Sequence, residues 1–374
     1  MKYWRGYLTA AIFAVFTWGL REFARAHTAL VDLIYPYVTR MAQNFLVDWN
    51  GSVEYCLWQV LLLVILALVI ASIVLMIVFK WNPFQWFGWV CAVVTAVIFL
   101  NTVVYGLNEF AGPLSDDIQL EETDYTVTEL EKAAAYFRDQ ANELADQVER
   151  DISGNVIFAD FDTLADQAAD GFEHLVYEES ESVFAGSLVP VKKLGWPDRF
   201  TARGITGITV GLTGEAAVNP QTPGVMLPFA ICREMARRMC IAIDRDASFG
   251  AYLACTANSD VQFRYSGALM GYRYCLKVLE SLEESAGESR SARVMASENL
   301  NLQHDLRVCD EFFGDAKMKD EGTCDLLTSW HIQEIVLPAL MVEEEAFDPM
   351  DKTQVDLSGL VNAEQENTDE EDTQ

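Results

Sequence analysis

Histidine is scarce in this chain of 374 residues. Its four histidines, His27, His174, His304 and His331, include no two that lie four residues apart. A metal site on one helix needs two ligands about one turn apart, so the chain has no histidine pair of that kind. The eight cysteines contain no C-x-x-C pair, which argues against a zinc ribbon and against a thioredoxin-type redox site.

Several motifs that announce nucleotide binding or nucleophilic catalysis are also missing. The chain contains neither G-x-G-x-x-G nor G-x-x-x-x-G-K-[ST], and it has no G-x-S-x-G nucleophile elbow. A dinucleotide-binding fingerprint, a P-loop and an α/β-hydrolase elbow are therefore not indicated.

Basic residues are few where the chain is polar. Of 26 Lys and Arg and 56 Asp and Glu, residues 1–114 hold six and five, which leaves 20 basic and 51 acidic residues in 115–374. The resulting formal charge of −31 repels nucleic acid phosphates and anionic lipid headgroups. We expect no nucleic acid partner, and we interpret the acidity as a means of solubility at the cell exterior.

Long apolar runs, by contrast, are present near the N-terminus. Leu57–Phe79 carries no charge over 23 residues, enough to cross a bilayer at about 1.5 Å per residue. Phe87–Tyr105 is a second run. Gly6–Leu20 is shorter, and it fits a short span, a signal anchor or the core of a signal peptide cleaved after Ala24-Arg25-Ala26. The sequence predicts a membrane region over 1–114, with two to three transmembrane helices at about 6–22, 57–79 and 86–106, and the lipid bilayer as a partner.

The basic residues near these runs predict an orientation. Lys2 and Arg5 precede the first run, and Lys80 lies between the second and third. Placing them in the cytoplasm puts the chain after residue 106 outside, whether or not the first run is cleaved. Arg21, Arg25 and Arg40 oppose this arrangement. We predict a multi-pass protein of the cell membrane with an extracytoplasmic soluble domain.

The polar region predicts an α+β fold that is mostly helical. Helical periodicity covers 126–151, where Thr128 and Glu131 have capping-box spacing, and again 161–177. Residues 189–191, 204–210 and 211–219 are rich in Gly and β-branched residues and predict a small sheet. Further helices are expected over 229–243, 246–257, 262–282 and 296–313. We assign 115–359 to this soluble domain and 360–374 to an acidic disordered tail.

The cysteines outside the membrane region are predicted to be buried free thiols. Most fall on apolar helical faces, where a thiol behaves as a small hydrophobic group. Cys232 and Cys240 lie two helical turns apart, about 12 Å, which is too far for a disulfide.

The helix predicted at 229–243 carries the most informative pattern. Residues 232–238 read C-R-E-M-A-R-R. Zinc peptidases carry H-E-x-x-H on such a helix, where two histidines bind the metal and the glutamate activates its water. Glu234 is present here, but Arg233 and Arg237 occupy the two histidine positions. Arginine keeps its proton in proteins and cannot ligate zinc.

Several segments, taken in order, resemble one bacterial family. They are Tyr35-Pro36, Gly106-Leu107-Asn108, Pro113-Leu114, Thr213-Gly214-Glu215-Ala216 with Val218-Asn219, Pro228-Phe229, Ala247 to Cys255, and Phe263-Arg264-Tyr265-Ser266-Gly267. The family is of unknown function, and its members are predicted to be membrane-anchored, zincin-like metallopeptidases with three N-terminal spans. The resemblance covers about residues 1–310.

The resemblance implies a zincin-like domain, and the departures from it fall on the chemistry. Arg233, Arg237 and Asp246 stand at what would be the metal-ligand positions, and Glu234 would be a vestigial general base. Groove residues would be Glu215, Asn219 and Tyr252. Zinc belongs to the resembled family, but we expect no cofactor and no metal here. Loss of ligands within a retained framework is typical of a pseudoenzyme.

A charge argument suggests what replaces the metal. Buried carboxylates without a counter-charge cost several kcal/mol. We hypothesise that Arg233 and Arg237 pair with Glu234, Asp246 or Glu215; the alternative is that both arginines point to solvent.

The expected function is binding or scaffolding by an inactive metallopeptidase-like domain, with a peptide, a cell-wall fragment or a protein as ligand. One alternative is a working hydrolase that uses Glu234 with an unrecognised metal site. Another is a purely structural subunit of a membrane complex. The sequence names no ligand for any of the three.

Overall fold

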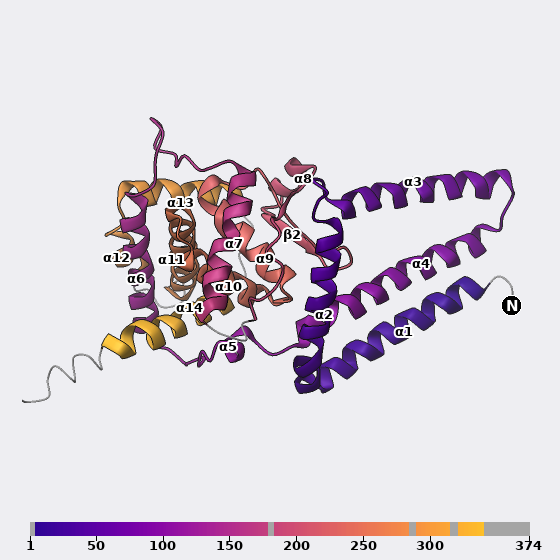
Figure 1. Ribbon diagram of the computed structural model, residues 1–374, viewed down its shortest axis with the longest axis horizontal. Helices are drawn as coiled ribbons and strands as arrows, with labels where there is room; N and C mark the ends of the chain where they lie inside the picture. Colours follow the sequence, from indigo (N-terminus) through magenta and orange to yellow (C-terminus); the bar gives the residue numbers. More distant parts are fainter. Residues whose placement is uncertain (1–3, 179–182, 284–288, 315–320, 340–374) are drawn as a thin grey trace, which may run out of the picture. The chain divides into compact units, whose positions relative to one another are not determined.

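The computed structural model describes residues 4–178, 183–283, 289–314 and 321–339 (Figure 1). Residues Met1–His331 form one compact unit, and Ile332–Gln374 form a second. The boundary predicted between residues 114 and 115 stays a prediction. The tail predicted over 360–374 lies outside the described residues.

Four long helices begin the chain: α1 (Arg5–Ala26), α2 (Thr28–Asn50), α3 (Leu57–Val78) and α4 (Pro83–Val104). Among the described residues, α3 and α4 are the two helices long and apolar enough to cross a membrane. They match two of the predicted spans. The third predicted span, at about 6–22, lies within α1, which does not meet the same criterion. We predicted no element over the residues of α2.

Helices α1 and α4 pack side by side through small residues. A Cβ added to Gly6 would lie 2.4 Å from the carbonyl carbon of Gly88, so only glycine allows the two backbones to approach this closely. Ala10 and Ala92 are buried one turn further along each helix. The spacing of four residues on both helices is typical of closely packed helix pairs in membranes.

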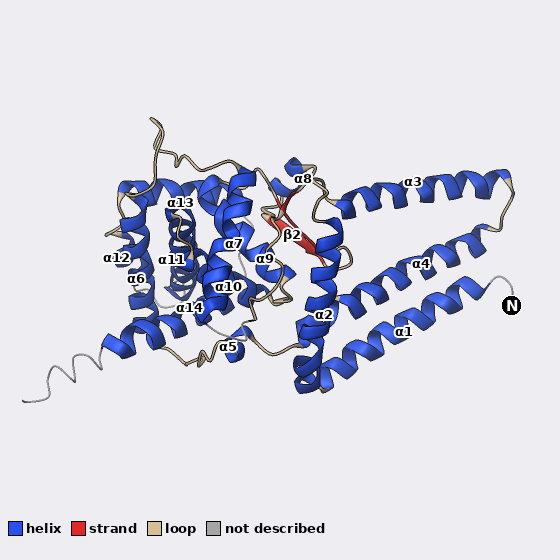
Figure 2. Ribbon diagram, viewed as in Figure 1, coloured by secondary structure: helices blue, strands red, loops and turns tan. Residues whose placement is uncertain are grey.

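The rest of the first unit is mostly helical (Figure 2). Its helices are η2 (Gly106–Phe110), α5 (Leu114–Asp117), α6 (Val127–Ala145), α7 (Phe161–Glu178), α8 (Pro197–Thr201), η3 (Gly224–Met226), α9 (Leu227–Arg238), α10 (Asp244–Ala257), α11 (Val261–Glu283), α12 (Arg290–Met295), α13 (Leu300–Phe313) and α14 (Glu321–Trp330). The last helix, η4, spans His331–Val336. The predicted mostly helical fold with a small sheet is confirmed; a zincin-like domain stays a prediction.

The N-cap of α6 lies two residues before the predicted one. Thr126 is the N-cap of α6: its hydroxyl accepts from the Glu129 amide at 3.3 Å, and the Glu129 carboxylate accepts from the Thr126 amide at 2.7 Å. The capping box predicted at Thr128 and Glu131 is therefore wrong. The same S/T-x-x-E spacing occurs twice in this stretch, and the earlier pair is the one at the helix start.

Three short strands form the sheet in the order β1-β3-β2. They are β1 (Lys192–Lys193), β2 (Gly207–Val210) and β3 (Glu215–Val218). β1 is parallel to β3, and β2 is antiparallel to it, with Ile208 opposite Ala217. β1 begins just after the strand predicted at 189–191. β2 is an outer strand of the sheet, and it lies beside α9.

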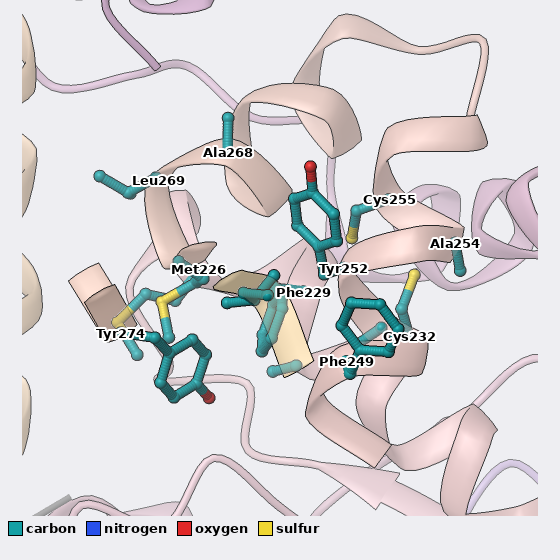
Figure 3. Close-up of a cluster of buried hydrophobic side chains, with 14 of the residues drawn as sticks. Met226, Phe229, Cys232, Phe249, Tyr252, Ala254, Cys255, Ala268, Leu269 and Tyr274 are labelled. Atoms are coloured by element: carbon teal, nitrogen blue, oxygen red, sulfur yellow. The ribbon is translucent and has the colours of Figure 1, made fainter. Parts of the chain in front are cut away.

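Helices α9, α10 and α11 meet in the core. Phe249, Tyr252 and Cys255 of α10 lie there among side chains of α9 and α11 (Figure 3). The six cysteines after residue 114, at 232, 240, 255, 275, 309 and 324, are buried and free, as predicted. Gly171 of α7 is a packing requirement, because a Cβ there would lie 2.0 Å from the carbonyl oxygen of Ala254.

Candidate functional site

Helix α9 is fixed at its start by α11. Pro228 lies in the first turn, where its missing N–H costs nothing. The Phe229 amide donates to the Ser266 hydroxyl at 3.2 Å, and that hydroxyl donates to the Val225 carbonyl at 2.7 Å. Ser266 therefore satisfies a free amide at the helix start, and it sets the rotation of the helix that carries Glu234.

Glu234 lies against the sheet. Its side chain is buried, and its Oε2 accepts from the Thr209 hydroxyl at 2.8 Å. Gly207 on the same strand makes room for it, since a Cβ there would lie 2.5 Å from Glu234 Cγ. The other carboxylate oxygen, Oε1, has no hydrogen-bond partner among the residues that the structure describes. A buried carboxylate oxygen without a donor is costly.

Arg233 and Arg237 share one carboxylate, that of Asp244 at the start of α10. The Arg233 guanidinium lies 3.4 Å from Asp244 Oδ1, and Arg237 forms an ion pair with the same oxygen. Burial lowers the pKa of Arg237, and the negative charge of Glu234 opposes this shift. The partner differs from those we hypothesised, because Asp244 takes the place of Glu234, Asp246 and Glu215.

These groups line a cleft of about 340 Å³. Its polar lining comes from α9 and the start of α10, and the loop and strand at 204–207 form another side. The apolar side is formed by Met226, Phe229, Ala230, Met270, Tyr274 and Phe313. The phenol of Tyr274 lies 3.5 Å from the Ser248 hydroxyl. The cleft thus joins a guanidinium pair to an apolar wall.

The C-terminal end of α9 is held by the N-terminal helices. The Tyr105 phenol donates to the Arg237 carbonyl at 2.7 Å, and Arg40 Nε donates to the Met239 carbonyl at 3.3 Å. Arg238 is buried beneath them and donates to the Ser187 carbonyl at 2.9 Å. Burial lowers the pKa of Arg238 to about 10. Helix α9 is therefore bound to the N-terminal helices at its C-terminal end and to α11 at its start.

Asp246 lies outside this cleft. Its Oδ2 accepts from the Leu114 amide at 3.1 Å, and its Oδ1 lies 3.1 Å from Arg245 Nε. Burial raises the pKa of its carboxyl, and the Leu114 hydrogen bond opposes the shift. Asp246 lines a separate pocket that also includes Arg40 and Asp117. The structure does not bring it together with Arg233 and Arg237.

Glu215 is at the base of α3, away from the cleft. Its carboxylate accepts from the amides of Leu57 and Trp58 at 2.7 and 2.9 Å, and it pairs with Lys192 at 2.8 Å. An acidic group in this place satisfies free amides at a helix start and complements the helix dipole. The contacts give Glu215 a role in joining α3 to the sheet.

The other two predicted groove residues are also structural in their contacts. Asn219 donates to the Thr201 hydroxyl at 2.9 Å and to the Ile205 carbonyl at 3.1 Å, so it supports the loop that borders the cleft. Tyr252 is buried in the core, 5.5 Å from the ring of Phe137. Neither side chain lines the cleft.

The cleft and the groups that support it include residues that the sequence did not single out. Thr209 binds Glu234, Asp244 binds the arginines, and Tyr274 lines the apolar wall. Asp244 lies only two residues from the predicted Asp246, but on the first turn of α10 the two carboxylates point in different directions. The position of Arg237 one turn after Arg233 was a usable signal, because both side chains then reach the same partner.

The side chains present do not fit a zinc ion. Guanidinium groups occupy both positions from which imidazoles would bind it, and they cannot act as ligands. Among the described residues, no group of three or more His, Cys, Asp or Glu side chains is arranged to hold a metal. The arrangement can bind an anion, because the two guanidinium groups donate hydrogen bonds to carboxylates or other oxyanions.

A family model described as "Protein of unknown function (DUF3810)" matches residues 31–320. No curated protein and no solved structure matches the chain. The matched range runs from α2 to beyond α13, so it includes α3, α4, the sheet and all of the cleft lining except Thr323. Because the match covers well over half of the chain, this protein belongs to that family of unknown function.

Proposed function

We propose that this protein is a membrane-anchored, zincin-like pseudoenzyme that binds a ligand in its cleft at the cell exterior. The observation that supports this most is the convergence of Arg233 and Arg237 on Asp244 beside the buried Glu234. Zincin hydrolysis takes its nucleophile from metal-bound water of lowered pKa. Guanidiniums in the ligand positions leave Glu234 without such a water to activate.

The charges suggest the chemical class of the ligand. Asp244 is 72% exposed, and ion pairs of exposed groups contribute only about 0–1 kcal/mol. A carboxylate on a ligand can therefore replace Asp244 at little cost, and the forked guanidiniums would hold it with paired hydrogen bonds. The apolar wall around Phe229 and Met270 suits a side chain next to that carboxylate. We infer a peptide-like ligand that ends in a free carboxylate.

Membrane attachment rests on α3 and α4. Both are apolar and long enough to span, and Lys80 lies in the turn between them. The Tyr7 and Phe84 rings lie 4.5 Å apart, so the basic start of α1 and this turn are at the same end of the helices. Basic residues at that end favour the cytoplasm, and the cleft would then face the exterior.

Peptide pools test this function on the full chain in detergent. One pool has short peptides with free C-terminal carboxylates, and the matched pool has C-terminal amides. The free pool should raise the melting temperature, and the amidated pool should not. Asp244→Asn should strengthen the effect because it removes the competing anion, and Arg237→Gln should remove it. Equal shifts from both pools, or a shift that neither variant alters, would refute the carboxylate site.

A further inference from the structure

Helix α2 has one face bound to the soluble domain. Gln43 donates to the Gly211 carbonyl at 2.9 Å, Thr39 donates to the Asn108 side chain at 3.1 Å, and Asn50 donates to the Thr213 carbonyl. All three polar side chains are buried. This face is polar because it meets backbone carbonyls and an amide of the domain, which need donors.

The opposite face of α2 is apolar and exposed. Its large side chains follow helical spacing and are 47–71% exposed: Leu30, Leu33, Ile34, Tyr37, Val38, Met41, Phe45 and Trp49. They form a stripe along the helix, which the exposed carboxylate of Asp48 interrupts near the C-terminal end. Soluble proteins rarely expose an apolar patch of this extent, and such patches mark binding surfaces.

The position of α2 indicates what covers this face. In Figure 1, α2 runs across the ends of α1, α3 and α4, which extend together to one side of it. The domain lies on the other side, where Gln43 and Asn50 bind it. The apolar stripe is opposite those contacts, so it faces the side on which the two candidate spans extend.

The start of α3 is bound to the soluble domain close to the end of α2. Cys56, six residues after the end of α2, precedes α3, whose first amides are bound by Glu215. Gln59 in the first turn exchanges two hydrogen bonds of 2.9 Å with Gly195. Beyond this turn α3 is apolar, and its most apolar 18 residues are 0% buried. The surface that α3 offers to lipid therefore continues directly into the stripe on α2.

We infer that α2 is an interfacial helix, which lies along the membrane surface with its apolar stripe in the boundary between headgroups and acyl chains. This rests on the proposed spanning of α3 and α4. The composition fits that depth, since Tyr37 and Trp49 are residues that favour the interface. An amphipathic helix in this position binds lipid through its apolar area. Its polar face, however, meets the protein instead of water.

The consequence concerns the cleft. Arg40 of α2 binds the Met239 carbonyl at the end of α9, and Thr39 contacts Cys240 at 3.4 Å. Helix α9, which carries Arg233 and Arg237, is therefore bound at its C-terminal end to α2, the helix that lies on the membrane surface. The cleft is held close to the membrane surface, where it would meet ligands attached to the membrane or emerging from it.

Tryptophan quenching in nanodiscs tests the inference with the full chain. The discs contain phosphatidylcholine with acyl chains brominated near the headgroup end, so emission is quenched where a tryptophan contacts lipid at that depth. The variants are Trp49→Phe on the stripe, Trp89→Phe in α4, and Trp330→Phe in α14, whose ring packs against Phe137 and Tyr252 of the soluble domain. Trp49 and Trp89 are 69% and 48% exposed, so both would report on lipid at their surfaces.

The share of emission that bromine quenches should fall in Trp49→Phe and in Trp89→Phe, because each loses a quenched emitter. It should rise in Trp330→Phe, which loses an unquenched one. If the quenched share rises in Trp49→Phe and falls in Trp89→Phe, the inference about α2 is wrong while the proposed spans stand. A second copy of the chain would then be the occupant of the stripe to examine. A rise in both would show that the proposed spans are wrong as well.

Discussion

At the scale of single residues, each of three buried carboxylates binds a different set of groups. Glu215 binds Lys192 and two amides, Glu234 binds Thr209, and Asp246 binds the Leu114 amide. The sequence argument assumed that such carboxylates would gather and need the two arginines. It could not see that backbone amides and a hydroxyl supply most of the required donors locally.

Lys192 offers a direct test of the Glu215 site. Lys192→Met should lower the free energy of unfolding by about 3–5 kcal/mol, because it leaves a buried carboxylate without its counter-charge. Adding Glu215→Gln should recover part of this loss, since the amide keeps an acceptor for the α3 amides and carries no charge. Urea unfolding of the full chain in micelles measures both. If Glu215→Gln instead lowers the free energy of unfolding of Lys192→Met further, as it would if the two residues acted independently, the pair is not coupled.

Asp246 predicts a pH effect of defined sign. Its pKa is raised above 3.8 by burial, so the folded protein holds a proton that the unfolded chain has already lost. The stability that Asp246 contributes is therefore present below about 3.8 and is lost as the pH rises through the folded pKa. Asp246→Asn lacks this loss. Relative to the parent chain, the variant should gain stability as the pH rises across that interval.

The difference between the two chains is the quantity to follow, because other carboxyls titrate over the same range. Asp117 has a pKa raised by burial and by Asp32, and Glu122 has one lowered by Arg245. Both are present in parent and variant, so the part of their effects that does not depend on the charge of Asp246 cancels in the difference. The charge of Asp246 also raises the pKa of Asp117, so its removal lowers that pKa and changes the difference in the same direction. A difference that stays constant with pH would contradict the account of Asp246.

At the scale of elements, strong periodicity was a reliable guide and proline was a misleading one. The buried positions Leu130, Ala134, Phe137 and Ala141 of α6 follow the predicted face. Helix α2 went unpredicted because Pro36 lies inside it, and a proline usually ends or kinks a helix. Its apolar residues nevertheless recur at helical spacing, so the periodicity that identified the other helices was a usable signal here as well.

The pairing of α1 with α4 can be tested by glycine substitution. Gly6→Leu should lower the melting temperature of the full chain in detergent, because a Cβ already meets the Gly88 backbone at 2.4 Å. Overpacking of this kind costs about 1–3 kcal/mol. Gly19 is on the same helix, and nothing lies within 4 Å of a Cβ placed there. Gly19→Leu is thus the matched control and should not lower the melting temperature, because leucine meets no clash there and favours a helix more than glycine does. An equal decrease in both variants would mean that α1 does not pack as described.

At the scale of the whole molecule, the cleft depends on contacts between distant parts of the chain. The sequence predicted α9 and the importance of Arg233, Glu234 and Arg237. It could not place Asp244 opposite them, because that contact requires the chain to turn sharply after α9, at Cys240 with φ of 77°. Nor could it show that Tyr105, at the end of α4, would hold the α9 backbone.

The zinc content of the protein tests the central claim most directly. The full chain and an Arg233→His/Arg237→His variant would be incubated with zinc, freed of loose metal by dialysis and analysed by mass spectrometry. A zinc ion about 2 Å beyond each imidazole nitrogen would lie roughly where the guanidinium ends now meet Asp244. Asp244 would then be available as a third ligand in the variant.

The account predicts that the parent chain retains no zinc and that the double variant retains about one ion per chain, as a site of three protein ligands would. Retention of one zinc ion per chain by the parent protein would contradict it.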